Sequence, residues 1–457
     1  MINDNKRYDL DEYNRNLKKG TEKSKNQLLM LRRTFVILLS TSLFLGLILI
    51  GGILGKAARG DGKTPIFELR NTDPTPPSTT IGTIASPTPT VPFVITEQLP
   101  ADPLSDAYWG ELVPAENPVP YEHFDVHGLY LNKVVNLEQC IDLANNSEIN
   151  AFVIDLKEAE GVYYNTSNET AAQIGYLYNY YNLEEVCQTC HDNDIYVIGR
   201  IVCFKDPRLA STYPDRAICD STGNPLFFST EGSEAFANPY DQRNWDYLIE
   251  LAEEAISMGV DEIQFDYVRF PTGSTTTGNA PYFGPDDQVP SKSAAINRFL
   301  QTARIRIQDT LGIPVTADIF GIAVTSSLDG DLLGQDWATV GFTGVDALCP
   351  MIYPSHYALG TQMNGMTFDA PDLYPYDIML NALLIGSQYH DQPGYSTVRP
   401  YLQAFTASYI GEGNYMEYDY EAINDQIRAL QDAGLDEWIL WNAAVEYPEG
   451  NYGGNNG

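Results

Sequence analysis

The sequence predicts an α/β fold, a (β/α)8 TIM barrel preceded by a single transmembrane helix and a Pro/Thr-rich linker. Three observations support this prediction: short apolar runs alternate with helix-like segments over residues 121–447, these runs number eight, and polar side chains recur where they end. An open doubly wound sheet is the alternative, but no glycine-rich phosphate loop follows the first run. We therefore expect one barrel, enlarged by insertions beyond the roughly 250 residues typical of this fold.

The predicted strands are short apolar runs, and helix-like segments lie between them. The strands are predicted at residues 127–132, 151–156, 195–203, 261–267, 313–319, 345–353, 397–405 and 436–442. The helices are predicted at residues 137–145, 183–192, 244–258, 293–310, 374–387 and 420–433. Because the order is strand then helix throughout, the strands are expected to be parallel, as a closed barrel requires.

The N-terminal part of the chain has the pattern of a membrane anchor. Residues 1–33 form a basic segment with nine Lys and Arg side chains against five acidic ones, and residues 34–54 contain no charge. At about 1.5 Å per residue, this apolar run matches the roughly 30 Å core of a bilayer. Since basic flanks stay on the cytoplasmic side, we expect a single-pass cell-membrane protein with its N-terminus inside and the remainder outside. A cleaved signal peptide is the alternative, because small residues follow the run.

Two further segments are predicted to lie outside the barrel. Residues 55–120 form a Pro/Thr/Ser-rich linker, and the twelve prolines within residues 61–120 favour an extended, semi-rigid chain. Residues 448–457 are predicted to be a disordered tail. The barrel is therefore expected over residues 121–447. The formal charge of -34 for the whole chain opposes electrostatic binding of nucleic acid.

Polar side chains recur at the carboxyl ends of the predicted strands, where the active sites of TIM barrels gather. The candidates for substrate binding are Asp155, Lys157, Glu158, Arg200, Arg269, Tyr353, His356, Gln403, Trp441 and Asn442. Arg399 lies in the same predicted strand as Gln403 and is expected at the same rim. For any single carboxylate, an ion pair that closes the rim is an equally good explanation. The collection of carboxylates, guanidinium groups and aromatic rings at one rim favours a functional site.

Asp266 and Asp318 are the candidate catalytic residues. They end neighbouring predicted strands, whose axes lie about 4.8 Å apart in a sheet. Their carboxyl groups are therefore expected within the roughly 5–9.5 Å that covers both retaining and inverting glycosidases, between which the sequence does not choose. Asp266 is the candidate nucleophile or base, and Asp318 the candidate acid. Arg200 or Arg269 would keep one carboxylate ionised, while a drier site would leave the other protonated.

The longest recognisable motif is Asp-Glu-Ile-Gln-Phe-Asp-Tyr-Val-Arg-Phe-Pro at residues 261–271. Shorter motifs lie at residues 204–206, 238–240, 317–321, 334–336, 350–357 and 399–403. Together, in order over about residues 125–446, they resemble a bacterial family described as a "putative glycosyl hydrolase domain". The resemblance implies a glycosidase-type TIM barrel on the outer surface of bacteria. The choice of Asp266 and Asp318 rests on their position at strand ends.

Two other glycosidase patterns match less completely. The chitinase-like family eighteen of glycoside hydrolases ends its fourth strand in Asp-x-Asp-x-Glu, where this chain has Gln264, Asp266 and Val268. Without an acid at position 268, the proton donor of that mechanism is missing. Alpha-amylase-type barrels place a nucleophilic Asp on strand four and a Glu acid on strand five. This chain matches the first at Asp266 but has the shorter Asp318 in place of the Glu.

No cofactor and no metal are expected. Residues 187–191 have the C-x-x-C-H spacing of haem attachment, but they lie on a predicted helix outside the barrel, where a haem has no pocket. The six cysteines are expected to be buried free thiols, with Cys187 and Cys190 the most plausible bridge if one forms. The five histidines show no zinc-site spacing.

These observations predict a membrane-anchored, extracytoplasmic glycoside hydrolase whose substrate is a bacterial wall or matrix polysaccharide. Two hypotheses from other classes remain open. One is a surface carbohydrate-binding protein whose barrel has no catalysis, and the other is a wall-associated scaffold in which the anchor and stalk matter most.

Overall fold

The computed structural model describes residue 99 and residues 102–452 of the chain. The predicted basic segment, the predicted anchor at residues 34–54 and nearly all of the linker up to residue 101 lie outside the described residues. Among the described helices, none is both long enough and apolar enough to cross a membrane.

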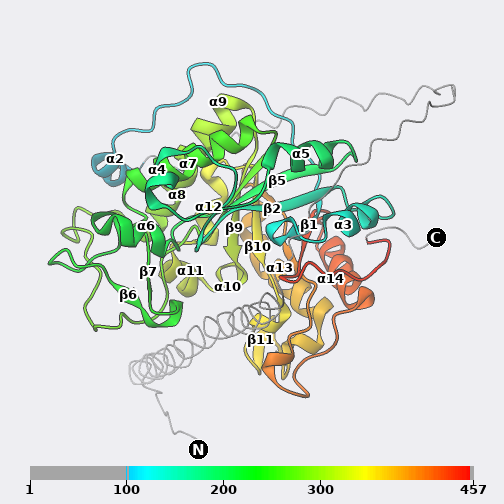
Figure 1. Cartoon of the computed structure of the whole chain (residues 1–457). Helices are drawn as coiled ribbons and strands as arrows, with labels where there is room; N and C mark the ends of the chain where they lie inside the picture. Colours follow the sequence, from blue (N-terminus) through cyan, green and yellow to red (C-terminus); the bar gives the residue numbers. More distant parts are fainter. Residues whose placement is uncertain (1–98, 100–101, 453–457) are drawn as a thin grey trace, which may run out of the picture.

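Eight parallel strands close into a barrel, which confirms the predicted TIM barrel (Figure 1). In barrel order they are β1 (His127–Leu131), β15 (Trp438–Trp441), β14 (Tyr401–Gln403), β10 (Ala347–Met351), β9 (Val315–Phe320), β8 (Glu262–Asp266), β5 (Tyr196–Val202) and β2 (Ala151–Glu158). The barrel closes because β1 pairs with both neighbours, Gly128 lying opposite Ile439 of β15 and opposite Ala151 of β2. The short β13 (Thr397–Val398) also pairs with β10.

Alternation along each strand divides its side chains between the inside and the outside of the barrel. In β8, Ile263 and Phe265 are fully buried beneath the helices, and Phe265 packs at 5.1 Å from Phe299. Glu262, Gln264 and Asp266 alternate with them and face the barrel interior. Polar side chains therefore occur at several levels along the axis of the barrel interior. The main apolar core lies between the strands and the surrounding helices.

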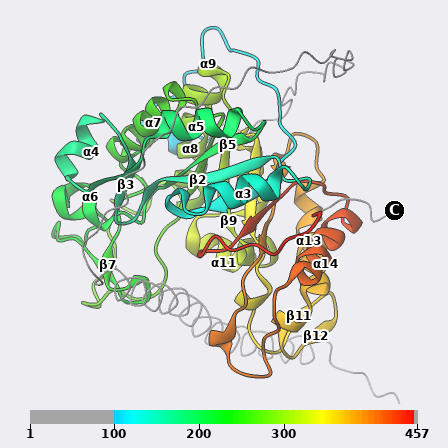
Figure 2. The ribbon, with the colours of Figure 1, turned by 45° about the vertical axis from the view of Figure 1, so that its right-hand side comes forward.

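Helices cover the outside of the barrel (Figure 1). The main ones are α3 (Leu137–Ala144), α5 (Leu183–His191), α7 (Gln242–Ser257), α8 (Lys292–Ala303), α13 (Pro375–His390) and α14 (Tyr420–Asp432). Each matches a helix predicted from the sequence, and α13 and α14 lie side by side (Figure 2). Side-chain caps define several of their starts: Asn182 accepts a hydrogen bond from the amide of Glu185, and Asp419 accepts one from Ala422.

Most insertions follow the carboxyl ends of strands, whereas α9 (Asp309–Leu311), which precedes β9, lies at the upper edge of the molecule in Figure 1. They contain β3 (Gly161–Tyr164), α4 (Glu169–Ile174), β4 (Leu177–Tyr181), α6 (Pro207–Thr212), β6 (Phe227–Phe228), β7 (Glu234–Ala235), α10 (Gly321–Thr325), α11 (Ser327–Leu333), α12 (Trp337–Val340), β11 (Thr361–Met363) and β12 (Met366–Phe368). These elements have two to seven residues, too few for a hydrophobic period to reveal them in the sequence.

The folded part begins before the expected boundary at Tyr121. Helix α2 (Pro103–Trp109) lies within the stretch expected to be linker, and the Trp109 indole N–H donates to the Tyr240 carbonyl oxygen at 3.0 Å. Further along, the Val119 amide donates to the Asp309 carbonyl oxygen at 2.8 Å. At the other end, Tyr452 of the expected tail is fully buried. Trp109 in the proline-rich stretch and Tyr452 in the glycine-rich tail therefore hold these two stretches against the barrel domain.

Candidate active site at the carboxyl end of the barrel

Arg200 is the centre of a cluster of four carboxyl groups. Its Nη1 contacts Asp155 and lies 2.5 Å from Glu158 Oε1. Its Nε and Nη2 donate to Asp266 Oδ2 at 3.1 and 2.5 Å, and its Nε lies 3.8 Å from Asp318 Oδ2. One guanidinium therefore faces four acidic groups, an excess of negative charge that favours protonation of at least one of them.

Strand register explains how this cluster forms. The carboxyl groups come from β2, β8 and β9, and β5, which carries Arg200, lies between β2 and β8 in the barrel. Arg200 pairs in register with Asp155 on one side and with Gln264 on the other. Asp266 lies one inward-facing position beyond Gln264. The long arginine side chain reaches that position, so one side chain joins the carboxyl ends of four strands.

Asp318 has an environment that favours its protonated form. Only 1% of the residue is exposed, and its Oδ1 is buried without a hydrogen-bond partner among the described residues. Burial, together with the nearby charge of Asp266, raises the pKa of Asp318 well above its usual range, although Arg200 opposes this shift. Asp318 therefore retains a proton at pH values where an ordinary aspartate is ionised, as a general acid requires.

Asp155 is also buried, but its oxygen atoms are already engaged. Its Oδ2 accepts the Tyr130 hydroxyl at 2.6 Å, and its other oxygen contacts Arg200. Burial raises the pKa of Asp155, and Glu158 adds to the shift while Arg200 opposes it. Asp155 thus joins Tyr130 to Arg200, an arrangement that suits a role in positioning the guanidinium.

Aromatic side chains form a wall beside the carboxyl cluster. Trp441 is half-buried, and its ring lies 5.9 Å from that of Tyr130 and 5.7 Å from that of Tyr353. Phe405 packs edge-on against Trp441 at 5.3 Å. These rings come from the ends of β1, β10, β14 and β15, opposite the carboxylate-bearing strands. Two predicted residues, Tyr353 and Trp441, thus lie together. Phe405 was not predicted as a site residue, and its signal in the sequence is its position two residues beyond the end of β14.

His356 follows β10 and joins this wall. It is half-buried, and its ring lies edge-on to Tyr353 at 4.9 Å. Burial lowers the pKa of His356 to about 4. The imidazole is therefore neutral near pH 7, with a nitrogen able to accept a hydrogen bond.

Two predicted cationic residues lie apart from the carboxyl cluster. Lys157 is 1% exposed, forms an ion pair with Asp206 at 2.9 Å and donates to the Val202 carbonyl oxygen at 2.7 Å. Arg269 is 2% exposed and binds both carboxylate oxygens of Glu231, at 3.0 and 3.2 Å. These contacts hold rim insertions to the barrel, while Arg269 Nε is buried without a hydrogen-bond partner among the described residues.

Two predicted amide residues have structural partners as well. Gln403 is fully buried, accepts the Ser355 amide at 3.1 Å and donates to Asp372 at 2.8 Å. Asn442 donates to the carbonyl oxygens of Ala404 and Glu446, at 2.8 and 2.7 Å. These contacts fix the loops after β10, β14 and β15.

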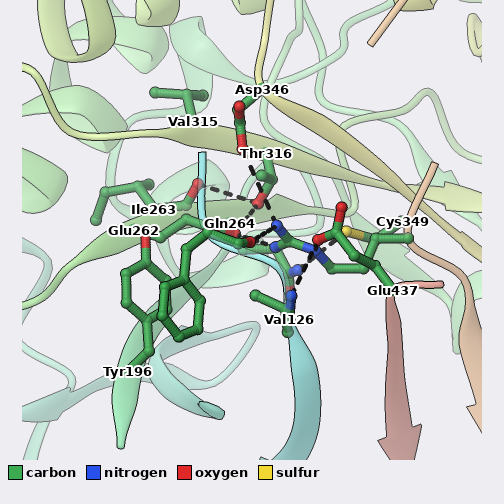
Figure 3. Close-up of polar contacts among 12 residues, drawn as sticks. Val126, Tyr196, Glu262, Ile263, Gln264, Val315, Thr316, Asp346, Cys349 and Glu437 are labelled. Atoms are coloured by element: carbon green, nitrogen blue, oxygen red, sulfur yellow. Dashed lines mark hydrogen bonds and ion pairs between the residues drawn. The ribbon is translucent and has the colours of Figure 1, made fainter. Parts of the chain in front are cut away.

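The sequence expectation that Arg399 lies at the same rim is wrong. Arg399 is fully buried at the amino end of the barrel, where it donates to Glu262 Oε1 and Glu437 Oε2, each at 2.7 Å. Figure 3 shows Glu262 and Glu437 at this end, with Asp346 nearby. The break between β13 and β14 at Arg399 and Pro400 separates this side chain from Gln403 at the rim.

His123, Asp125 and Glu437 form a group that could hold a metal ion, with ligand atoms within 4.8 Å of one another. His123 Nδ1 lies 2.9 Å from Asp346 and its Nε2 lies 2.8 Å from Glu437. Although burial opposes the charge, these hydrogen bonds raise the pKa of His123 to about 10. A protonated imidazole with both nitrogens engaged favours a structural ion-pair network over metal ligation.

All six cysteines are free thiols, and five are buried. Cys187 and Cys190 lie on α5, and burial raises the pKa of each thiol to about 12. Their sulfur atoms are therefore protonated at neutral pH, which disfavours thiolate chemistry at this pair.

A closed parallel barrel with clustered carboxyl groups and aromatic rings at the carboxyl ends of its strands defines a glycosidase-like TIM barrel. Residues 126–447 match the model of a family described as "Putative glycosyl hydrolase domain". This match covers more than half of the chain, so the protein belongs to that family, and it carries a domain of glycosyl hydrolase type.

Three solved structures illustrate the likeness. A hypothetical protein from Ruminiclostridium thermocellum ATCC 27405 is 39% identical, with 42% of this chain and 96% of that chain covered and a TM-score of 0.37. The PgaB (BpsB) glycoside hydrolase domain from Bordetella bronchiseptica is 13% identical. The match covers 70% of this chain and 94% of that chain, with a TM-score of 0.49. The Bacillus cereus spore cortex-lytic enzyme SleL is 12% identical. The match covers 72% of this chain and 74% of that chain, with a TM-score of 0.40. Comparison with curated proteins gave no match.

Proposed function

We propose that the protein hydrolyses glycosidic bonds of a bacterial cell-wall or matrix polysaccharide and that Asp266 and Asp318 are its catalytic residues. The observation that carries this proposal is the unequal state of the two carboxyl groups around Arg200. Asp266 accepts two hydrogen bonds from the guanidinium, whereas the Oδ1 of Asp318 is buried without a described partner and its pKa is raised.

These two environments suit the two steps of glycoside hydrolysis. Protonated Asp318 would donate its proton to the oxygen of the scissile bond, while ionised Asp266 would attack the anomeric carbon or activate a water molecule. Arg200 Nε lies 3.1 Å from Asp266 Oδ2 and 3.8 Å from Asp318 Oδ2, so these oxygens are at most about 7 Å apart. That limit includes the roughly 5–5.5 Å separation of retaining enzymes and only the lower edge of the roughly 6.5–9.5 Å range of inverting enzymes. Tyr353 and Trp441 would then supply ring faces for the sugar.

The location of the activity follows from the sequence outside the described residues. The uncharged run at residues 34–54 and its basic flank support a single-pass anchor with the barrel on the outer side of the cell membrane. A barrel in that position would meet wall or matrix polymers directly.

The test uses the full-length protein in detergent with a panel of bacterial wall and matrix glycans, and it quantifies released reducing ends. The parent protein should release them from one class of polymer, and Asp266→Asn should be about 10³-fold slower with an unchanged unfolding transition. Asp125→Asn is the matched control, because that carboxylate is exposed at the amino end of the barrel. Equal activity of Asp266→Asn and the parent would refute the assignment. Binding without release by either protein would favour the carbohydrate-binding alternative.

A further inference from the structure

The end of β2 continues into a small sheet extension beside the carboxyl cluster. β3 pairs antiparallel with β2, Gly161 lying opposite Glu158, and β4 pairs parallel with β3. The Tyr181 hydroxyl at the end of β4 donates to the Asp155 carbonyl oxygen at 2.5 Å. β4 is therefore fastened to the strand that carries two of the rim carboxylates.

This extension exposes a pair of stacked tyrosines, Tyr178 and Tyr180, which we call the tyrosine platform. The residues are 38% and 47% exposed, and their rings lie 5.2 Å apart and nearly parallel, at 7°. Tyr163 packs edge-on beneath them, 5.9 Å from Tyr178 and 5.0 Å from Tyr180, and Lys133 Nζ lies 4.9 Å from the centre of the Tyr180 ring. The two rings cover one face of each other, and the part of each that stays exposed combines an apolar body with a hydroxyl tip, which suits binding.

The backbone adopts costly conformations to present the platform. Asn179, between the two tyrosines, has φ 47°, in the left-handed region that L-residues rarely adopt. The register is irregular there, since Val162 pairs with Leu177 but Tyr164 pairs with Tyr181. At Gly161, with φ 147°, a Cβ atom would lie 2.2 Å from the Tyr176 carbonyl oxygen. Such local strain persists where the surrounding structure enforces it, often at functional sites.

The platform is continuous with the carboxyl cluster. Glu158, which lies 2.5 Å from Arg200, is followed by the β2–β3 turn. Glu160 in that turn accepts the Tyr163 hydroxyl at 2.5 Å, and the Tyr163 ring supports the platform. The platform is therefore joined to the carboxyl cluster through Tyr163 and the β2–β3 turn.

We propose that the tyrosine platform is a remote subsite that binds sugar rings of the same polysaccharide chain outside the cleavage point. This inference rests on the proposed function. The apolar C–H face of a pyranose ring packs on an aromatic face. The Lys133 ammonium, which lies 3.9 Å from Glu160 Oε1, has three N–H donors and can offer one to a sugar hydroxyl. Binding energy gained away from the reacting bond would favour long chains over short ones.

The test compares kcat/KM for the polysaccharide with kcat/KM for its short oligosaccharides, using the full-length protein. In Tyr178→Ala/Tyr180→Ala, the ratio of polymer to oligosaccharide should fall about tenfold, mainly through a higher KM for the polymer. Tyr178→Phe/Tyr180→Phe keeps both rings and should keep the ratio. Tyr282→Ala is the matched control, because Tyr282 is 51% exposed outside the platform. An unchanged ratio in the double alanine variant would overturn the subsite while leaving the proposed hydrolysis intact.

A second measurement covers the case in which the parent protein cleaves no glycan, which would refute the proposed function itself. Retention of the protein on insoluble polysaccharide is then compared between the parent and the double alanine variant. Retention of the parent alone supports the subsite, whereas equal retention or no retention by both overturns it. A change in oligomeric state in the double alanine variant would identify the platform as a protein interface and would also overturn the proposal.

Discussion

Asp266 and Asp318 have the same chemistry but different surroundings at the rim. Asp266 Oδ2 accepts a hydrogen bond from Arg200 Nε at 3.1 Å, and its Oδ1 accepts one from the Tyr267 amide at 2.5 Å. Asp318 Oδ2 lies 3.8 Å from Nε of the same guanidinium. Burial and the neighbouring charge of Asp266 raise the pKa of Asp318 and so disfavour its ionisation. Separate environments for two carboxyl groups are how a site runs acid and base chemistry at one pH.

The pH dependence of activity tests the role of Asp318. Because its raised pKa keeps the proton on Asp318, kcat/KM of the parent should stay high above the usual aspartate range and fall as the pH rises through that pKa. Asp318→Asn should lose about 10²–10⁴-fold on the polysaccharide and should lack this alkaline decline. It should retain far more activity on aryl glycosides, whose leaving groups need little protonation.

The measurement is kcat/KM from pH 4 to pH 9 on both substrate types. An alkaline decline that persists in Asp318→Asn would assign it to another group, and equal losses on both substrates would contradict the role as an acid.

At the scale of elements, an ion-pair network ties the amino ends of the strands together. Arg399, between β13 and β14, joins Glu262 of β8 to Glu437, which precedes β15. His123 joins Glu437 to Asp346, which precedes β10. Burial would raise the pKa of Glu437, but Arg399 and His123 lower it to about 2. One oxygen of the network, Glu262 Oε2, is buried without a hydrogen-bond partner among the described residues. The ion pairs of the network join the amino ends of several strands, so its role is to hold these strands together.

His123→Gln tests this network through the pH dependence of stability. The pKa of His123 is about 10 in the folded protein and 6.5 without these partners, so its contribution is full below about pH 6.5 and is lost as the pH rises through 10. The variant should lower the free energy of unfolding by about 1.5–3 kcal/mol at pH 6 and by less at pH 10.

Chemical denaturation at both pH values measures this difference. His191→Gln, an exposed histidine on α5, is the control and should change stability by less than about 1 kcal/mol. A destabilisation by His123→Gln that is equal at both pH values would show that the histidine is not charged in the folded state.

For the whole molecule, the two ends of the barrel have different tasks. The amino end is closed by buried ion pairs, whereas the carboxyl end carries β3, β4, β6, β7, β11 and β12 and the carboxyl cluster. The formal charge of -34 surrounds this architecture with a negative field. That field disfavours strongly anionic polymers as substrates and leaves neutral or cationic ones.

The anchor is tested on the whole chain. The full-length protein should sediment with membranes and resist extraction with salt, whereas a variant without residues 34–54 should be released, because an apolar helix of this length partitions into the bilayer. Fractionation followed by N-terminal mass analysis of the mature protein is the measurement. An N-terminus beyond residue 54 would show cleavage and contradict the anchor.

Local patterns in the sequence were sufficient to predict the barrel strands, the main helices and the end of the barrel at which polar side chains gather. An alternation of apolar runs with helical segments implies a parallel barrel, and residues at strand ends must meet at one end of it. Asp155, Glu158, Arg200, Asp266 and Asp318 were therefore predicted together, and the structure brings them together.

Which of the rim residues are free to bind, and which are occupied, depended on tertiary structure. Arg200 reaches Asp266 because of strand register, whereas Lys157, Arg269 and Gln403 meet partners contributed by distant loops. Arg399 lies at the opposite end because its strand is interrupted. Such contacts join residues far apart in the chain, and the insertions that supply them are too short to leave a hydrophobic period. The sequence by itself therefore determined the barrel and the end at which polar side chains gather, and only the folded chain decided which partner each of these side chains has.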